Sequence, residues 1–95
     1  AADWYEDTMK RRLMGIARAT FSELTLVDES VLSTSPNIYE INFSLQVGNA
    51  SAVRLRRIAD YFYGTPVSVE SVKCSFGSLS QPVSCLIVGS AAYLL

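Results

Sequence analysis

The sequence predicts an α+β fold of two layers, in which two helices cover one face of a four-stranded antiparallel sheet. Three observations support this prediction. Residues 38–48 alternate between apolar and polar side chains, which is the period of a half-buried strand. Two other segments repeat apolar residues at spacings of three and four, which is the period of one helix face. Each of these helical segments is followed by two strand-like segments separated by a polar loop.

The first helical segment is expected to run from near Trp4 to about Phe21. Asp3 is a candidate N-cap, and Glu6 three residues later completes a capping-box pattern. The apolar stripe of this helix consists of Met9, Leu13, Ile16, Ala17, Thr20 and Phe21. Residues 22–32, which are rich in Thr, Val and Leu, then form the first strand of a hairpin, and the alternating segment forms its second strand.

The second helical segment has Asn49 and Ser51 as candidate caps, and Gly64 is expected to end it. Its apolar stripe consists of Ala52, Leu55, Ile58, Ala59 and Phe62. Strands are expected at residues 67–76 and 83–94, and they form a second hairpin. The order of elements is therefore αββαββ.

A shift of 42 residues indicates that one αββ unit is used twice. It brings Leu13 onto Leu55, Ile16 onto Ile58, Ala17 onto Ala59 and Val27 onto Val69. Two such halves, about residues 4–48 and 49–95, make a single domain that is a circular permutation of the ferredoxin-like βαββαβ sandwich. Right-handed connections then predict the sheet order 3-4-2-1, with the second and fourth strands at the centre.

The two cysteines flank the second hairpin. If residues whose numbers sum to 159 face each other, Cys74 pairs with Cys85, Val72 with Ile87, and Phe76 with Val83. All six side chains then point to one face, which is expected to be the core. Facing cysteines can form a disulfide in an oxidising compartment. The alternative is two buried thiols, and a chain without histidine is not expected to form a zinc site from them.

Motifs for catalysis or for cofactor binding are absent from the sequence. It contains no histidine, no glycine-rich phosphate loop and no GxSxG element. We therefore expect no enzymatic activity, no cofactor and no bound metal. The net charge of −1 does not suit a nucleic-acid-binding domain. The polar face of the alternating strand, with Glu40, Asn42 and Gln46, also lacks the aromatic and basic residues of an RNA-binding sheet.

Two surfaces are candidates for protein association. In the last strand, Leu86, Val88, Ala92 and Leu94 alternate with the core positions and would be exposed if helices cover one face only. The alternative is that this segment buries both of its faces. The other candidate is the unpaired edge strand that starts at Val67 and contains Val69.

The two helical segments also carry seven of the eight basic residues, among them Arg11 and Arg18. Such residues most simply form a solvated outer surface. Contact with an acidic partner or with anionic lipid is the alternative interpretation.

The alternating strand that ends at Gly48, the small residues Ala50 to Ala52, the short helix, and the Pro-containing turn before a Val-rich strand together carry a resemblance. In these features the chain resembles the periplasmic domains of the PilN, PilO and GspM families. These are inner-membrane assembly proteins of type IV pili and type II secretion systems. The resemblance implies a fragment of a longer, membrane-anchored bacterial protein, whose periplasmic domain forms homodimers or heterodimers with similar domains.

From the sequence we therefore expect a structural scaffold that acts by dimerisation. The alternative is a dimeric regulatory domain of the ACT kind, which binds a small ligand. A transmembrane helix in the upstream sequence would favour the scaffold, and a fused enzyme domain would favour the regulatory domain.

Overall fold

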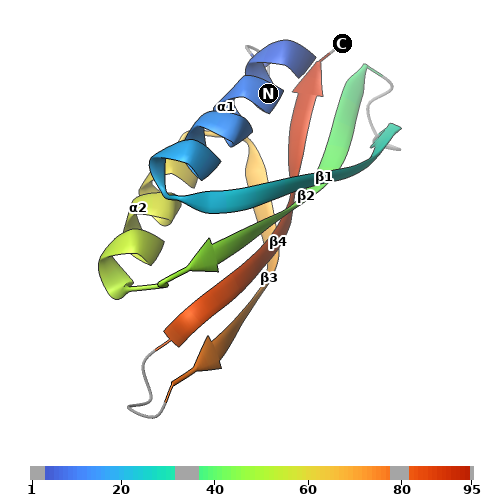
Figure 1. Cartoon of the computed structure of the whole chain (residues 1–95). Coiled ribbons are helices and arrows are strands. Elements are labelled where there is room, and N and C mark those ends of the chain that lie inside the picture. Colours follow the sequence, from blue (N-terminus) through green and yellow to red (C-terminus); the bar gives the residue numbers. More distant parts are fainter. Residues whose placement is uncertain (1–3, 32–36, 78–81, 95) are drawn as a thin grey trace.

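A computed structural model describes the backbone of residues 4–31, 37–77 and 82–94, and all their side chains except those of 28–31 and 82. The elements follow the predicted αββαββ order (Figure 1): α1 (Glu6–Ala19), β1 (Ser22–Val31), β2 (Ile38–Gly48), α2 (Ala52–Phe62), β3 (Val67–Phe76) and β4 (Pro82–Leu94). Neither of these helices is long and apolar enough to cross a membrane.

The four strands form one antiparallel sheet in the order β1-β2-β4-β3. This order is the predicted one, and it places the two most apolar strands at the centre. The pairing of β2 with β4 is regular along its whole length, from Ile38 opposite Leu94 to Gly48 opposite Ser84. The outer strands are less regular, because the β1–β2 and β3–β4 pairings each contain register shifts.

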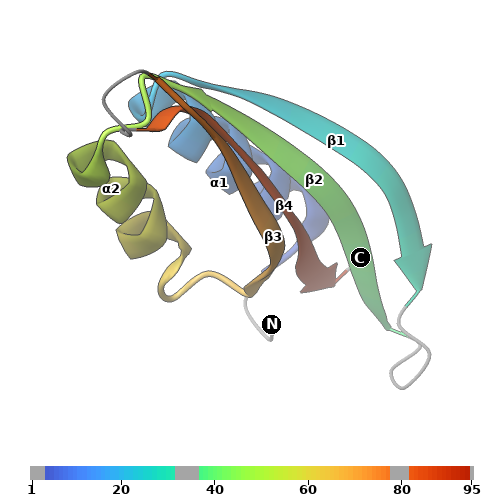
Figure 2. The same ribbon diagram turned by 90° about the horizontal axis from the view of Figure 1, so that it is seen from below.

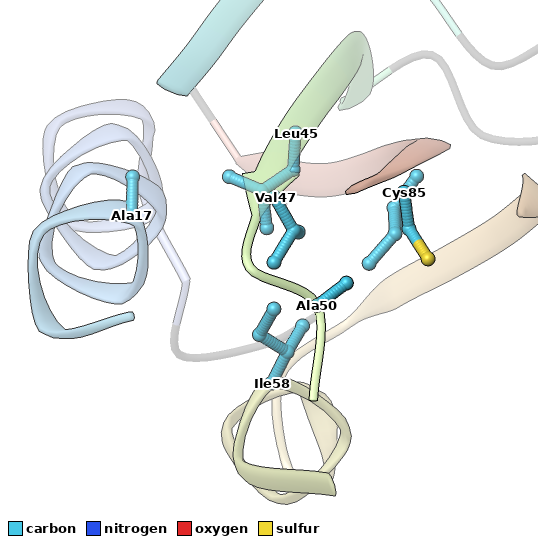
Figure 3. Close-up of a cluster of buried hydrophobic side chains, with 7 residues drawn as sticks. Ala17, Leu45, Val47, Ala50, Ile58 and Cys85 are labelled. Atoms are coloured by element: carbon cyan, nitrogen blue, oxygen red, sulfur yellow. The ribbon is translucent and has the colours of Figure 1, made fainter. Parts of the chain in front are cut away.

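Both helices lie on the same side of the sheet (Figure 2). The alternate residues of β2 that face them, Ile41, Phe43, Leu45 and Val47, are all buried. Under α2, Ile58 packs with Leu45, Val47 and Cys85, and with Ala50 from the connection that precedes the helix (Figure 3). The alternation in β2 therefore corresponds to one covered face and one uncovered face of the sheet.

Helix α1 begins later than the sequence suggested. Its N-cap is Tyr5, which makes no side-chain capping hydrogen bond, and Asp3 lies outside the described residues. The delay has a tertiary cause, because the backbone N–H of Leu94 donates to the carbonyl oxygen of Trp4 at 2.7 Å and holds this segment extended. The helix also ends earlier, at Ala19. Phe21, predicted to belong to the stripe, has a φ of 52° and is exposed.

The predicted limits of α2 are closer to the observed ones. The side chain of Ser51 accepts a hydrogen bond from the backbone N–H of Arg54 at 3.1 Å and caps the helix, as expected. Asn49 is not a cap, because it adopts a φ of 49° in the turn that leaves β2. Gly64 has a φ of 83°, and this left-handed conformation just after the helix is the one that glycine adopts without strain.

The predicted register of the second hairpin is confirmed at its centre, but it is wrong at the end near the turn. Val72 lies opposite Ile87 and Cys74 opposite Cys85, as predicted. Phe76, however, lies opposite Pro82 and not Val83, because the pairing shifts after Ser75. The burial expected for this hairpin is also only partly right: Cys85 and Ile87 are buried, but Val72, Phe76 and Val83 are exposed.

Candidate protein-interaction surface

The helix layer does not cover strand β3 completely. An 11-residue helix is about 16 Å long, whereas a strand of 10 residues extends about 33 Å. Helix α2 also makes few close backbone approaches to any strand, while α1 packs closely on β1 and β4. The helix-facing side of β3 is therefore left partly open, and the end of the β3–β4 hairpin extends beyond α2 (Figure 1).

An apolar groove occupies the space between α2 and β3. It has a volume of about 200 Å³, and all of its lining side chains are apolar: Leu55, Ile58, Ala59 and Phe62 from α2, Val69 and Val72 from β3, and Ile87 from β4. Ile58 and Ile87 form its buried floor, while Val69 and Val72 are exposed at its rim. The groove is thus an open continuation of the hydrophobic core.

Exposed apolar side chains extend this groove toward the end of the hairpin. Val72 is 53% exposed and Phe76 is 63% exposed, and Val83 on the neighbouring strand is also exposed. We call the groove together with Phe76 and Val83 the α2–β3 patch. A single exposed apolar side chain needs no explanation, but an apolar groove with several exposed apolar side chains on the same hairpin is typical of an interaction site.

A disulfide lies next to the patch, between Val72 and Phe76 along β3. Cys74 and Cys85 are bonded with a Cα–Cα distance of 4.0 Å, so the predicted disulfide is confirmed and the alternative, two buried thiols, is wrong. Cys85 is buried in the core, while Cys74 is half-buried beside the open part of β3. The bond joins the outer strand β3 to the central strand β4 at a position where Cys85 also packs with Ile58 of α2.

The charged residues that adjoin the patch are of both signs. Arg56 and Asp60 are exposed on α2 and Glu70 is exposed on β3, whereas Lys73, opposite Leu86, lies on the uncovered face of the sheet. An apolar surface with neighbouring charges of both signs does not select a strongly charged partner, and it suits a partner with a similar mixture of charges.

The two sheet edges are less available than the sequence suggested. Strand β3 is an edge strand, but its pairing is irregular between Val69 and Ser71, and it carries the charges of Glu70 and Lys73. Strand β1 is irregular between Leu26 and Glu29. Irregularities and charges of this kind hinder the regular addition of another strand at an edge.

The interface residues predicted from the sequence lie on three separate surfaces. Leu86, Val88, Ala92 and Leu94 lie half-buried on the uncovered face of the sheet. Val67 packs against the core, and Val69 lies at the rim of the patch. The third surface is the outer side of α1, where Arg11 and Arg18 are exposed.

Sequence reasoning missed most of the patch. Leu55 and Phe62 were expected in the core, and Val72 and Phe76 were expected to be covered. The available signal was the difference in length between helix and strand. A helix rises less than half as far per residue as a strand, so a helix of 11 residues cannot cover a strand of 10.

Within the described residues, no three His, Cys, Asp or Glu side chains come together as a metal site. A scan of protein-family models and searches of curated proteins and of solved structures find no match to this chain.

Proposed function

We propose that this chain is a non-enzymatic scaffold domain that pairs with a copy of itself, or with a similar domain, through the α2–β3 patch. In the fuller form of the proposal it is the periplasmic part of a bacterial inner-membrane protein. That protein would belong to the assembly platform of a type IV pilus or a type II secretion system, with the membrane anchor outside this chain. The αββαββ order and the β1-β2-β4-β3 sheet support a circularly permuted ferredoxin-like fold for it.

The observation that carries the proposal is the apolar groove beside α2. Two copies related by a two-fold axis would place the same patch on both sides of the contact, so each groove would be covered by its counterpart. The neighbouring charges favour such pairing, since Arg56 of one copy can face Asp60 or Glu70 of the other in an opposite-sign pair. The disulfide is compatible with an oxidising compartment such as the periplasm.

The alternative, a regulatory domain that binds a small ligand, has less support at this groove. Ligand sites generally combine an apolar pocket with a few convergent polar groups. The α2–β3 groove is lined by seven side chains, all apolar.

The test compares two valines of nearly equal exposure at opposite edges of the sheet. Val72 is 53% exposed within the patch, and Val27 is 51% exposed on β1. We expect the wild-type chain to sediment as a dimer at micromolar concentration. Val72→Lys should be monomeric, because it places a charge in the interface, and Val27→Lys should remain dimeric.

A wild-type chain that stays monomeric would next be co-expressed with a second domain of the same element order, to detect a heterodimer. If it remains monomeric there too, the proposal is wrong. Equal dimerisation by both valine variants would show that association uses another surface.

A further inference from the structure

A second groove lies between the two helices, and the α2–β3 patch does not include it. Its volume is about 380 Å³. Helix α1 contributes Arg11, Arg12 and Gly15, the segment before α1 contributes Trp4, and α2 contributes Tyr61. The groove therefore combines two guanidinium groups with two aromatic side chains.

The side chain of Arg12 is held in place by neutral partners. Its Nη2 donates to the carbonyl oxygen of Tyr61 at 3.0 Å, and its Nε is 3.4 Å from the hydroxyl oxygen of Thr65. The guanidinium carbon also lies 5.5 Å from the centroid of the Tyr61 ring. Among the described residues, no carboxylate lies within ion-pair distance of Arg12. Its charge is thus fixed in position, and Nη1 remains available to a further acceptor.

Arg11 adds a second positive charge at the same groove. It is exposed and makes no hydrogen bond or ion pair with any described residue. Of the residues that line the groove, Arg11 and Arg12 are the charged ones, so its lining carries two positive charges. The groove therefore attracts an anionic partner.

The space between the arginines is not suited to an anion alone. Trp4 and Tyr61 form its walls, and Ile16 contributes apolar surface. Gly15 leaves the centre of α1 open, since a Cβ added there would meet no atom within 4 Å. A ligand that fills this groove needs an apolar group next to its negative charge.

We infer that the inter-helix groove binds an acidic peptide segment of a partner protein. A carboxylate of the segment pairs with Arg12 and Arg11, and a neighbouring bulky apolar side chain occupies the space between Trp4 and Tyr61. Planar guanidinium groups bind carboxylates through paired hydrogen bonds, and one that is already held in position loses little freedom on binding. This inference does not depend on dimerisation through the α2–β3 patch.

Trp4 makes the test direct, because it is the only tryptophan in the chain and it lines the groove. The probe is the capped peptide acetyl-Asp-Glu-Leu-Leu-Glu-Asp-amide, and the control is the same peptide with Asn and Gln in place of the acids. We expect the acidic probe to change the fluorescence of Trp4 with saturation, and to bind more weakly as salt is added. The amide control should not bind. If the acidic probe gives no response at millimolar concentration, the inference is wrong.

Matched variants separate a local site from general attraction. Arg11→Gln should weaken binding by about tenfold, the effect of losing one charge-assisted hydrogen bond. Arg56→Gln removes the same charge from α2 outside the groove, and it should change the affinity less than about twofold because an exposed charge is screened. Equal losses in these two variants would overturn the inference.

Gly15→Leu tests the groove without changing any charge. The leucine side chain fills the opening, so binding should be lost while the helix itself becomes more stable. Unchanged affinity in this variant would contradict the proposed position. Vesicles containing phosphatidylglycerol provide the last arm: a Trp4 response to vesicles, with none to the peptide, would replace the peptide by a lipid surface.

Discussion

The two αββ halves have the same order of elements but very different coverage. In the first half, α1 buries four side chains, namely Met9, Leu13, Ile16 and Ala17. In the second half, α2 buries only Ile58. Of the three helix positions related by the 42-residue shift, only Ile16 and Ile58 are buried in both halves. Leu13 and Ala17 are buried, whereas Leu55 is half-buried and Ala59 is exposed.

This difference indicates which half of the domain can contact a partner without loss of the fold. The first half is closed by α1, so its apolar side chains contribute to stability. The second half has the Cys74–Cys85 bond beside the single buried side chain of α2, and its apolar side chains at Leu55, Val69 and Val72 remain available for contact.

The largest expected effect is a contrast between two equivalent leucines. Leu13→Ala should lower the free energy of unfolding by about 3 kcal/mol, because Leu13 is 1% exposed in a packed core. Leu55→Ala, at the half-buried equivalent position, should cost about 1 kcal/mol. Urea denaturation of both variants, at a concentration where the chain is monomeric, measures the difference. Equal losses would mean that α2 covers its half as fully as α1 does.

Reduction of the disulfide should affect the second half more than the first. The bond closes a short loop, with a sequence separation of 11 residues, so its loss should cost about 2–3 kcal/mol. Amide hydrogen exchange in reducing buffer should accelerate in β3, whereas the β1–β2 pairing should change less. Uniform acceleration across the sheet would show that the bond supports the whole domain and not one half.

Gly89 lies at the seam between the halves, opposite Phe43 of β2 and Val69 of β3. A Cβ at this position would lie 2.5 Å from the carbonyl oxygen of Ser68 and 3.1 Å from the Phe43 ring. We expect Gly89→Ala to cost about 2 kcal/mol, because both neighbours belong to packed structure. Thermal unfolding measures the loss. A stability equal to wild type would indicate that β3 can move away from the seam freely.

The smallest effects come from intrinsic helix propensity, and they are tested by opposite substitutions in the two helices. Gly15→Ala in α1 should raise the free energy of unfolding by about 1 kcal/mol, since the added methyl group meets no neighbour. Ala59→Gly, at an exposed position of α2, should lower it by a similar amount. Chemical denaturation of the pair gives the comparison. If Ala59→Gly has no effect, then α2 contributes little to the folded state.

Local patterns predicted the elements, their order and much of the register. The alternation in β2 and the sum rule for Cys74 and Cys85 depend on neighbouring residues and on one turn, so they could be read directly from the sequence. The start of α1 could not, because it depends on a hydrogen bond between Leu94 and Trp4, two residues at opposite ends of the chain.

The candidate sites were harder to predict for a similar reason. Alternation shows which face of β3 carries Val72, but it does not show whether a helix covers that face. The inter-helix groove depends on Arg12 reaching Tyr61 and Thr65, which are 49 and 53 residues away in the sequence. Neither relation has a local signature.

The hydrogen bond between Leu94 and Trp4 also brings the two ends of the described chain side by side, at the end of the molecule away from the β3–β4 hairpin (Figure 1). A domain with adjacent ends can be inserted into a loop of another protein with little distortion of the host. Attached in this way, the domain would be joined to its host by two chain segments at one end. The α2–β3 side would then point outward, and pairing of two such domains through the α2–β3 patch would join their hosts.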